Sequence, residues 1–265
     1  MRPAPVALLL AILIAGGPVT AGAPDPAAPG SPVSGAAQAF LAGETGDCPG
    51  CNLKGVSLKR RNLAGANLAG ADLAGASLHR AVLRGANLAG ADLTGANLNK
   101  TDLVRADLSG AKLAGAMMFE ADASRADFSH ANLAEALMGS VRLPGARLDG
   151  AVLSEADLEA AFLNEASFAG ATLSGANLHQ VRMLRANLSG ARASGAEFTR
   201  ANLRDANLAG ARLTESVFYL ADLSGADLTG ADLGHAVLRS ANLAGAVATG
   251  TVFTGAMMPD NTIHP

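Results

Sequence analysis

The only cysteine pair of the chain is the first place to look for chemistry. Cys48 and Cys51 stand in the sequence Cys-Pro-Gly-Cys, a spacing that serves thiol–disulfide exchange at the start of a helix that follows a strand. The neighbouring sequence lacks that context. Two cysteines are too few for a zinc site, which takes about four ligands, and Asn52 stands where haem attachment requires histidine. A structural disulfide is the favoured interpretation, and a thiol–disulfide redox function remains an alternative.

A second constellation places a carboxylate, an imidazole and a hydroxyl at equal intervals. Glu159, His179 and Thr199 are each twenty residues apart, in the order of a hydrolytic triad. Such a triad also needs a pocket that excludes water and donors for an oxyanion. The repeat described below predicts flat faces, so we predict no catalytic residue, no metal site and no cofactor.

Charged residues of both signs alternate in one stretch: Asp102, Arg105, Asp107, Asp122, Arg125, Asp127, Arg142 and Arg147. The aspartates alone would suggest a cation site. The arginines favour a ladder of salt bridges instead, in which each exposed pair contributes little stability. A net charge of −3 with interspersed signs gives no case for binding nucleic acid.

A five-residue repeat positions all of these groups. Every fifth residue from Leu53 to Met258 is apolar: 30 Leu, five Phe, four Met and three Ala. Every fifth residue from Cys51 is Ala at 34 of 42 positions. Because no insertion or deletion interrupts either series, we expect each repeat to stack on its neighbours.

The repeated pattern is Ala-(Asp/Asn)-Leu-x-Gly, as in ANLAGADLAGASL at Ala66–Leu78 and ADLSGADLTGADL at Ala221–Leu233. The chain resembles the pentapeptide-repeat family over about four-fifths of its length. The resemblance implies an all-β solenoid, a right-handed quadrilateral parallel β-helix with one pentapeptide per side and twenty residues per coil. It also implies that the central Leu or Phe and the Ala two residues before it point inward.

Elementary packing agrees with that fold. Asn or Asp before each Leu can bond to turn backbone, and coils stacked about 4.8 Å apart give a rod roughly 50 Å long. Each Ala that replaces a central Leu is followed five residues later by Phe, in the pairs Ala123 and Phe128, Ala193 and Phe198, and Ala248 and Phe253. We expect the small residue to make room for the ring of the next side, which keeps the core filled.

The sequence divides into five parts. Residues 1–21 are predicted to be a signal peptide, since Arg2 precedes the apolar stretch Val6–Ala15 and small residues lead to Ala21. A retained anchor is the rival interpretation, but about ten apolar residues are too few to span a bilayer. We therefore expect a periplasmic or secreted protein without membrane insertion after cleavage.

The remaining parts are a disordered linker at 22–33, an N-terminal helical cap at 34–47, the β-helix at 48–258 and a C-terminal tail at 259–265. The cap is expected to be a short α-helix with Ser34 as N-cap and with Ala37, Phe40 and Leu41 on its apolar side. The tail is expected to be too short to form a second cap.

The last position of each pentapeptide distinguishes the sides of the coil. Gly occupies it at nine of ten coils on the side of Gly70, and at none on the side of Arg60. A type II turn needs a positive φ at its second central residue, which favours Gly. We therefore predict type II turns on the Gly70 side and a different turn, with only negative φ, on the Arg60 side.

Large side chains collect on the Arg60 side, which is the predicted interaction face. Its candidate residues are Arg60, His79, Arg80, Met117, Phe119, Leu137, His179, Arg200, Val217, Tyr219, Leu220 and Arg239. Aromatic residues, Met and Arg are enriched in protein interfaces, although scattered apolar residues on a permissive surface are the alternative.

The last coil is a second place for association. The residues that crowd it are Val252, Phe253, Met257 and Met258. We expect either end-to-end self-association or a tail that folds back as a lid.

Together, these features predict a non-enzymatic, exported pentapeptide-repeat protein that acts as a rigid structural or protein–protein interaction module. A DNA mimic that binds gyrase or topoisomerase and a thiol–disulfide redox protein are the alternatives.

Overall fold

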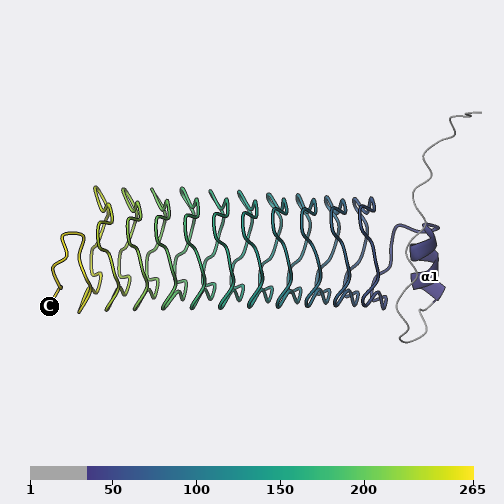
Figure 1. The fold of residues 1–265 in the computed structure, drawn as a ribbon, viewed down its shortest axis with the longest axis horizontal. Helices are drawn as coiled ribbons and strands as arrows, with labels where there is room; N and C mark the ends of the chain where they lie inside the picture. Colours follow the sequence, from purple (N-terminus) through teal and green to yellow (C-terminus); the bar gives the residue numbers. More distant parts are fainter. Residues whose placement is uncertain (1–34) are drawn as a thin grey trace, which may run out of the picture.

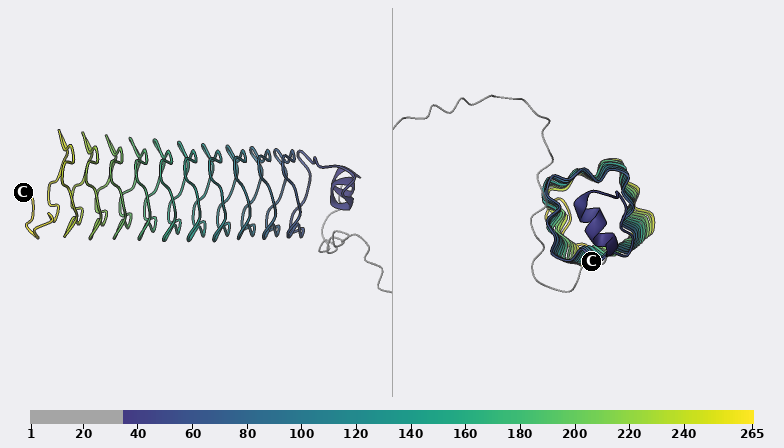
Figure 2. Two further views of the ribbon diagram at one scale, coloured as in Figure 1. Left: turned by 90° about the horizontal axis from the view of Figure 1, so that it is seen from above. Right: turned by 90° about the vertical axis from the view of Figure 1, so that its right-hand side faces the viewer.

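The computed structural model describes residues 35–265. The predicted signal peptide, the linker and the Ser34 N-cap lie outside the described residues. One helix, α1 (Gly35–Ala42), precedes a straight stack of coils, and the C-terminus lies at the opposite end (Figure 1). Viewed along its axis, the stack has a four-cornered outline with α1 across its end (Figure 2). The predicted short N-terminal helix is thus confirmed.

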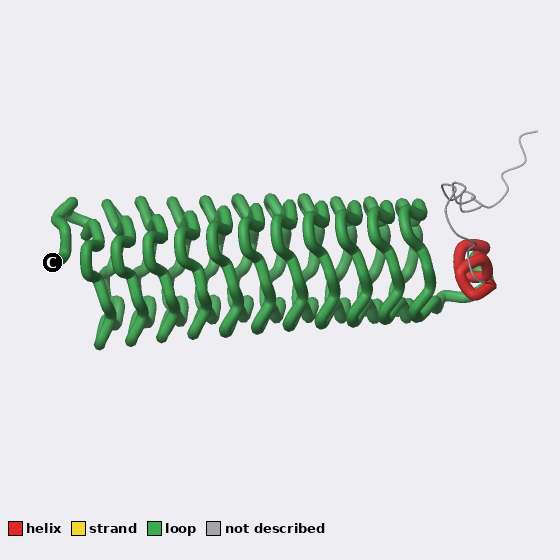
Figure 3. The backbone as a smooth tube through the Cα atoms, turned by 90° about the horizontal axis from the view of Figure 1, so that it is seen from below, coloured by secondary structure: helices red, strands yellow, loops and turns green. Residues whose placement is uncertain are grey.

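The coils are joined by parallel bridges between residues twenty positions apart. Asn67 pairs with Asn87, and Asn87 with Asp107, and the same register continues on every side from Asn52 to Met257. The Leu68 N–H donates to the Asn87 carbonyl at 2.7 Å, and the Asn87 N–H donates back to the Ala66 carbonyl at 2.9 Å. Each side contributes only one bridged residue, so within residues 35–265 no longer strand forms (Figure 3).

The core is two columns of apolar side chains on each side of the coil. From residue 53 to residue 238, the central Leu residues and nearly all of the Ala residues two positions before them are buried. Rings stack along the axis at one point, where Phe198 and Phe218 of successive coils lie with their centroids 4.8 Å apart and nearly parallel. Ala193, beside Phe198, is fully buried, so no solvent enters where the small residue replaces Leu.

Only two of the three Ala–Phe pairs lie in the closed core. Ala123 and Phe128 are fully buried, as are Ala193 and Phe198. In contrast, Ala248 is exposed and Phe253 is half-buried. The third pair belongs to the last coil, where no following coil covers it.

Asn and Asp hold the corners as predicted. The Asn87 Oδ1 accepts the Ala89 N–H at 3.1 Å, and the Asp127 Oδ1 accepts the Ser129 N–H at 2.8 Å. The same bond, from the residue before the central Leu to the backbone two residues on, recurs on all four sides. This local acceptor favours the turn over an extended backbone.

The predicted difference in turn geometry is wrong. Arg60, Ala160 and Leu220 on the Arg60 side have φ of 57°, like Gly70 at 64°. The hydrogen-bond ladder explains it, because the N–H of this last position donates to the next coil on both sides: from Arg60 to the His79 carbonyl at 3.0 Å and from Gly70 to the Ala89 carbonyl at 2.9 Å. The stack therefore imposes the left-handed conformation and its cost of about 1 kcal/mol on non-glycine residues.

Arg61 is one of the residues that attach the cap to the first coil. Ala37 and Phe40 of α1 are fully buried, and Leu41 packs against the same core. Arg61 replaces the usual Ala of its column and donates to the carbonyl oxygens of Phe40 at 3.0 Å and Leu41 at 3.3 Å. These are carbonyls at the C-terminal end of α1, where a cation is favourable. Partial burial lowers the pKa of Arg61.

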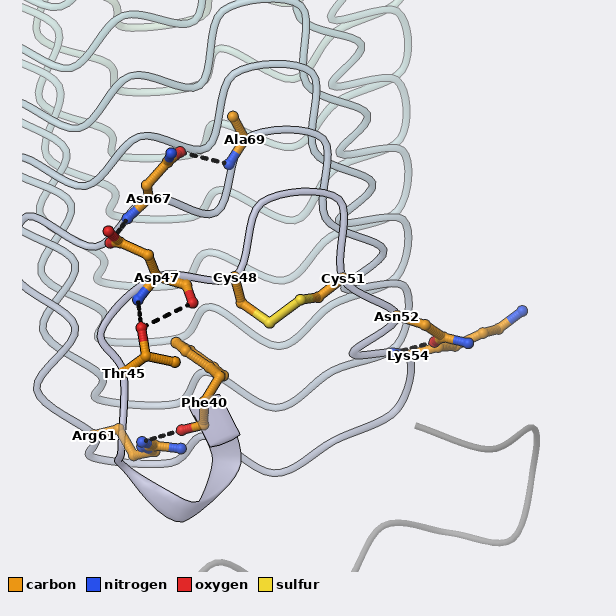
Figure 4. The surroundings of a disulfide bond; sticks show 10 residues. All are labelled: Phe40, Thr45, Asp47, Cys48, Cys51, Asn52, Lys54, Arg61, Asn67 and Ala69. Carbon is orange, nitrogen blue, oxygen red and sulfur yellow. Dashed lines mark hydrogen bonds between the residues drawn. A yellow bond between two sulfur atoms is a disulfide. The ribbon is translucent and has the colours of Figure 1, made fainter. Parts of the chain in front are cut away.

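A disulfide joins Cys48 and Cys51 beside this contact, with their Cα atoms 5.4 Å apart and the Phe40 ring close to Cys48 (Figure 4). Both cysteines are buried, with exposures of 1% and 5%. Asp47 adds a polar contact, since its Oδ1 accepts the Asn67 N–H at 2.8 Å. The Arg61 and Asp47 bonds fix the cap to the coils, and the disulfide closes the turn that follows the cap. The burial of both cysteines leaves little access for an attacking thiolate.

The C-terminal tail folds back over part of the other end, the alternative that the sequence analysis set beside end-to-end association. Ile263 forms an antiparallel bridge with Met257, and the His264 N–H donates to the Ala256 carbonyl at 2.9 Å. A tight turn at Asn261, whose φ is 70°, reverses the chain. Seven residues therefore suffice to pair with one side of the last coil.

Candidate interaction face

The predicted interaction residues all lie on one side of the rod. We call this side the Arg60 face: it consists of the pentapeptides that end at residue 60 and at every twentieth residue after it. One column of bridges runs along it, from Ser57 through Met117, Leu137 and Val217 to Met257. Side chains that are distant in sequence therefore form one strip parallel to the rod axis.

Along this strip the predicted residues differ in exposure. Those that are exposed are Arg60, Arg80, Phe119, Leu137, Arg200, Tyr219, Leu220 and Arg239. Those that are half-buried are His79, Met117, His179 and Val217. The large apolar side chains among them fall into two groups rather than along the whole strip.

The first group surrounds a hollow of about 400 Å³. Its apolar lining is Met117, Phe119 and Leu137, with Phe119 45% exposed and Leu137 51% exposed. Gly139 leaves the hollow open, because the positions one coil before and after it carry Phe119 and Glu159. The Asn99 Oδ1 accepts the Phe119 N–H at 2.8 Å, and this hydrogen bond holds the Phe119 backbone in place. We call this site the Phe119 hollow.

The second group lies five coils further on, a distance of roughly 24 Å at the usual spacing between strands. Tyr219 is 36% exposed and Leu220 is 42% exposed, next to the half-buried Val217 and Val237. The Arg239 guanidinium lies 5.8 Å from the centre of the Tyr219 ring, within the range of a cation–π contact. The ring is thereby held against the rod.

Charge changes sign along the Arg60 face. Basic residues occupy its first coils, where Lys59, Arg60, Arg80 and Lys100 occur without a carboxylate. Acidic residues gather at the Phe119 hollow, which is lined by Asp157 and Glu159. Glu120, on the same stretch, is already paired with Lys100 at 3.2 Å.

Glu159, His179 and Thr199 lie in one column, but no hydrogen bond or ion pair joins their side chains in the part of the chain that the structure describes. Residues 35–265 also contain no group of three His, Cys, Asp or Glu side chains placed to hold a metal ion.

The aspartates form a partial salt-bridge ladder on two adjacent sides, the side that follows the Arg60 face and the Gly70 side. Asp122 pairs with Arg142 at 3.8 Å and Asp127 with Arg147 at 3.2 Å. Asp102 pairs instead with Arg84 at 2.8 Å, a partner that the sequence analysis missed because it stands on the preceding coil. Arg105 and Arg125 make no ion pair among the described residues.

Contacts of this kind lower the pKa of two carboxyl groups, those of Asp127 and Asp92. Burial acts to raise the pKa of Asp127, but the hydrogen bond from the Ser129 N–H and the charge of Arg147 outweigh it, and the pKa is lowered. Hydrogen bonds from Thr94, with the Lys112 ammonium 3.7 Å away, lower the pKa of Asp92. Both carboxylates are therefore stabilised in the charged form near neutral pH.

The sequence analysis also missed an aromatic contact. Phe162 lies between the guanidinium groups of Arg142 and Arg182, at 5.4 Å and 4.8 Å from the ring centre. The three residues are twenty positions apart in one column, so sorting the sequence by side would have revealed them.

The residues predicted for end-to-end contact are only partly available. The tail is hydrogen-bonded to the last coil, the Met258 N–H donating to the Thr262 carbonyl at 2.8 Å, and Met257 is bridged to Ile263. Phe253 is half-buried with His264 beside its ring, whereas Val252 is 46% exposed. The N–H groups of Leu243, Ala248 and Phe253 have no hydrogen-bond partner in residues 35–265.

The geometry of stacked five-residue turns agrees with a known family of sequences. The family model for pentapeptide repeats matches residues 51–88, 86–122, 124–159, 151–183, 183–219 and 216–255. The chain belongs to the pentapeptide-repeat family. Proteins of this family are generally non-enzymatic, and the comparisons indicate no catalytic family. No curated protein sequence matches the chain significantly.

Three solved structures are similar to this chain, and the first of them, HetL, supports the same fold. HetL, a pentapeptide-repeat protein involved in heterocyst differentiation regulation in the cyanobacterium Nostoc sp. strain PCC 7120, is 30% identical with a TM-score of 0.54, and the match covers 86% of this chain and 97% of HetL. Rfr23 from the cyanobacterium Cyanothece 51142 is 33% identical with a TM-score of 0.41, over 43% of this chain and 90% of Rfr23. QnrB1, a plasmid-mediated fluoroquinolone resistance protein, is 18% identical with a TM-score of 0.40, over 74% and 86%.

Within the described residues, the helix α1 is too short to cross a membrane, and no other helix is present that could do so.

Proposed function

We propose that this pentapeptide-repeat protein is a rigid, non-enzymatic interaction module that binds a protein partner through the Arg60 face. The observation that carries the proposal is the arrangement of exposed Phe119, Leu137, Tyr219 and Leu220 along one side of a continuously hydrogen-bonded rod. Exposed aromatic and aliphatic groups held by a rigid scaffold lose little entropy on binding.

We also propose that the protein is exported by a signal peptide at residues 1–21, which is then cleaved, and that it acts in the periplasm or outside the cell. The proposal also includes the right-handed sense of the four-sided coil. The basis for export is the sequence pattern around Arg2, Val6–Ala15 and Ala21, together with the Cys48–Cys51 disulfide, because disulfides persist in oxidising compartments.

Self-association through the C-terminal end is the second form of partner binding that we consider. It is supported by the free backbone donors of the last coil and by exposed Val247 and Val252, at 49% and 46%. An unpaired edge of this kind is a template for another chain. The tail reduces this surface, so the Arg60 face is the preferred site.

Site-specific photocrosslinking in the native host tests the proposal. A photoreactive residue replaces Tyr219, which is exposed on the Arg60 face, and in a control it replaces Ala209, which is half-buried on the Gly-rich Gly70 side. We expect a discrete heterologous adduct from position 219 alone. Equal adducts at both positions, or none at position 219 with the protein confirmed as exported, would contradict an interaction role for this face.

A further inference from the structure

We infer that the Phe119 hollow receives a segment of a protein partner in which an apolar side chain stands next to a lysine or arginine. This inference rests on the proposed function and names the chemistry that one part of the Arg60 face would recognise. The first support is shape. Phe119, Met117 and Leu137 form the apolar lining of a concave site of about 400 Å³, which is within the usual size of ligand sites.

The hollow exists because small residues coincide at one point of the face. Gly139 stands in the column that holds Phe119 and Tyr219 in other coils, and Ser140 and Ala160 occupy positions that are Arg or Lys at residues 60, 80, 100 and 200. A Cβ atom at Gly139 would lie 3.5 Å from the Phe119 ring. The ring therefore lies against the floor of the hollow, and its exposed surface remains free for a partner.

The second support is charge. The Asp157 Oδ1 accepts the Glu159 N–H at 3.1 Å and the Asn177 amide at 2.9 Å, but no base pairs with either acidic side chain among residues 35–265. The Glu159 carboxylate is exposed and has no bonded partner there. An apolar site with two unneutralised carboxylates at its rim favours a cation beside the apolar group that enters it.

The nearest basic residue that precedes the hollow on the Arg60 face is already paired. Lys100 is bonded to Glu120 at 3.2 Å, so it does not neutralise Asp157 or Glu159. An acidic partner would therefore meet like charge at the rim, whereas a basic one gains an ion pair. This selects the sign of the partner segment, while the apolar lining supplies the contact area.

Two variants separate shape from charge. Gly139 has an ordinary backbone conformation, and its column accepts Phe119 and Tyr219 elsewhere, so Gly139→Leu fills the hollow without straining the turn. Its matched control is Thr199→Leu, which places the same leucine side chain in the same column outside the hollow. Glu159→Gln removes the rim charge, and Glu197→Gln removes an exposed carboxylate elsewhere on the same face.

The probe is a phage-displayed library of random twelve-residue peptides selected on the whole protein, followed by fluorescence anisotropy with synthetic peptides. We expect selected peptides to carry Lys or Arg next to Leu, Ile, Met or Phe. We also expect at least a tenfold loss of affinity with Gly139→Leu and none with Thr199→Leu. Glu159→Gln should weaken binding about threefold at low salt, since exposed ion pairs are weak, and Glu197→Gln should not.

Peptides that bind Gly139→Leu as well as the unaltered protein, peptides without a basic residue, or the absence of any selected peptide would each overturn this inference. Crosslinking at position 219 is read separately. Adducts there, combined with any of those results, would leave the interaction function standing and remove only the Phe119 hollow as its site.

Discussion

Replacing Phe198 with leucine tests how the core is packed around Ala193, one of the three Ala residues that replace a central Leu. Phe198 is fully buried, stacks on Phe218 at a centroid distance of 4.8 Å, and is preceded by the buried Ala193 five residues earlier. Leucine restores much of the apolar volume but none of the ring stack. The expected cost is about 0.5–1.5 kcal/mol for the lost aromatic pair and a similar amount for the space left beside Ala193.

The total is therefore about 1–3 kcal/mol, which corresponds to a fall of roughly 2–12 °C in Tm for a chain of this size. The matched control is Phe168→Leu, because Phe168 is also a fully buried central residue of its pentapeptide but is preceded by Leu163 and has no ring partner among the described residues. Circular dichroism during denaturation by guanidinium, with a double-mutant cycle that adds Phe218→Leu, isolates the stacking contribution.

Equal destabilisation by Phe198→Leu and Phe168→Leu, with no coupling to Phe218→Leu, would refute this account. The volume near Ala193 would then be filled by movement of the neighbouring coils, and ring stacking would add nothing to stability.

Four further predictions concern the ends of the rod and its charges. Arg61→Met should lower stability by about 1–3 kcal/mol and increase hydrogen exchange in α1, because it removes the donors to the Phe40 and Leu41 carbonyls; unchanged exchange in α1 would show that Arg61 does not hold the cap. Replacing Cys48 and Cys51 together by serine should cost about 2 kcal/mol in thermal or denaturant unfolding without loss of partner binding, whereas lost binding at full stability would favour a redox role. Because the pKa of Asp92 is lowered on folding, its charge stabilises the protein above the ordinary pKa of about 4, and this contribution is lost as pH falls through the lowered pKa. The difference in unfolding free energy between the protein and Asp92→Asn should therefore be largest near neutral pH and shrink in acid. A difference that is independent of pH would contradict this expectation. If the last coil self-associates, light scattering should show a mass that rises with concentration and falls with Val252→Lys, and a strict monomer at high concentration would exclude the end-to-end contact.

Most of the fold was predictable because the repeat encodes it redundantly. The positions of Leu68 and Ala66 inside the coil, and of Asn67 at the corner, follow from residue type at a fixed spacing, and the observed bonds agree. The alignment of Phe119 and Tyr219 on one face also followed, since a period of twenty residues places both in the same column. Whether that face binds a partner is not encoded in the period, and it stays a prediction.

What the sequence analysis missed depends on bonds between coils. The turn at Arg60 was expected to avoid positive φ, because residue preference was considered one side at a time. In the stack, the Arg60 N–H must reach the His79 carbonyl, and the satisfied ladder outweighs a local preference of about 1 kcal/mol. Likewise, Arg61 in the first coil and Ile263 in the tail act through neighbours that a single-column pattern does not show.

The same redundancy explains why function, if it resides on the Arg60 face, is carried by exceptions to the repeat. A rod of identical pentapeptides would have uniform sides and no concave site. The Phe119 hollow arises where Gly139, Ser140 and Ala160 replace larger residues beside Phe119, and the backbone bridges on either side remain unbroken. These surface positions can therefore vary while the inward Leu and Ala columns and the hydrogen-bond ladder stay intact. This separation predicts that changes at the hollow alter binding and leave the unfolding transition nearly unchanged, while changes such as Phe198→Leu do the reverse.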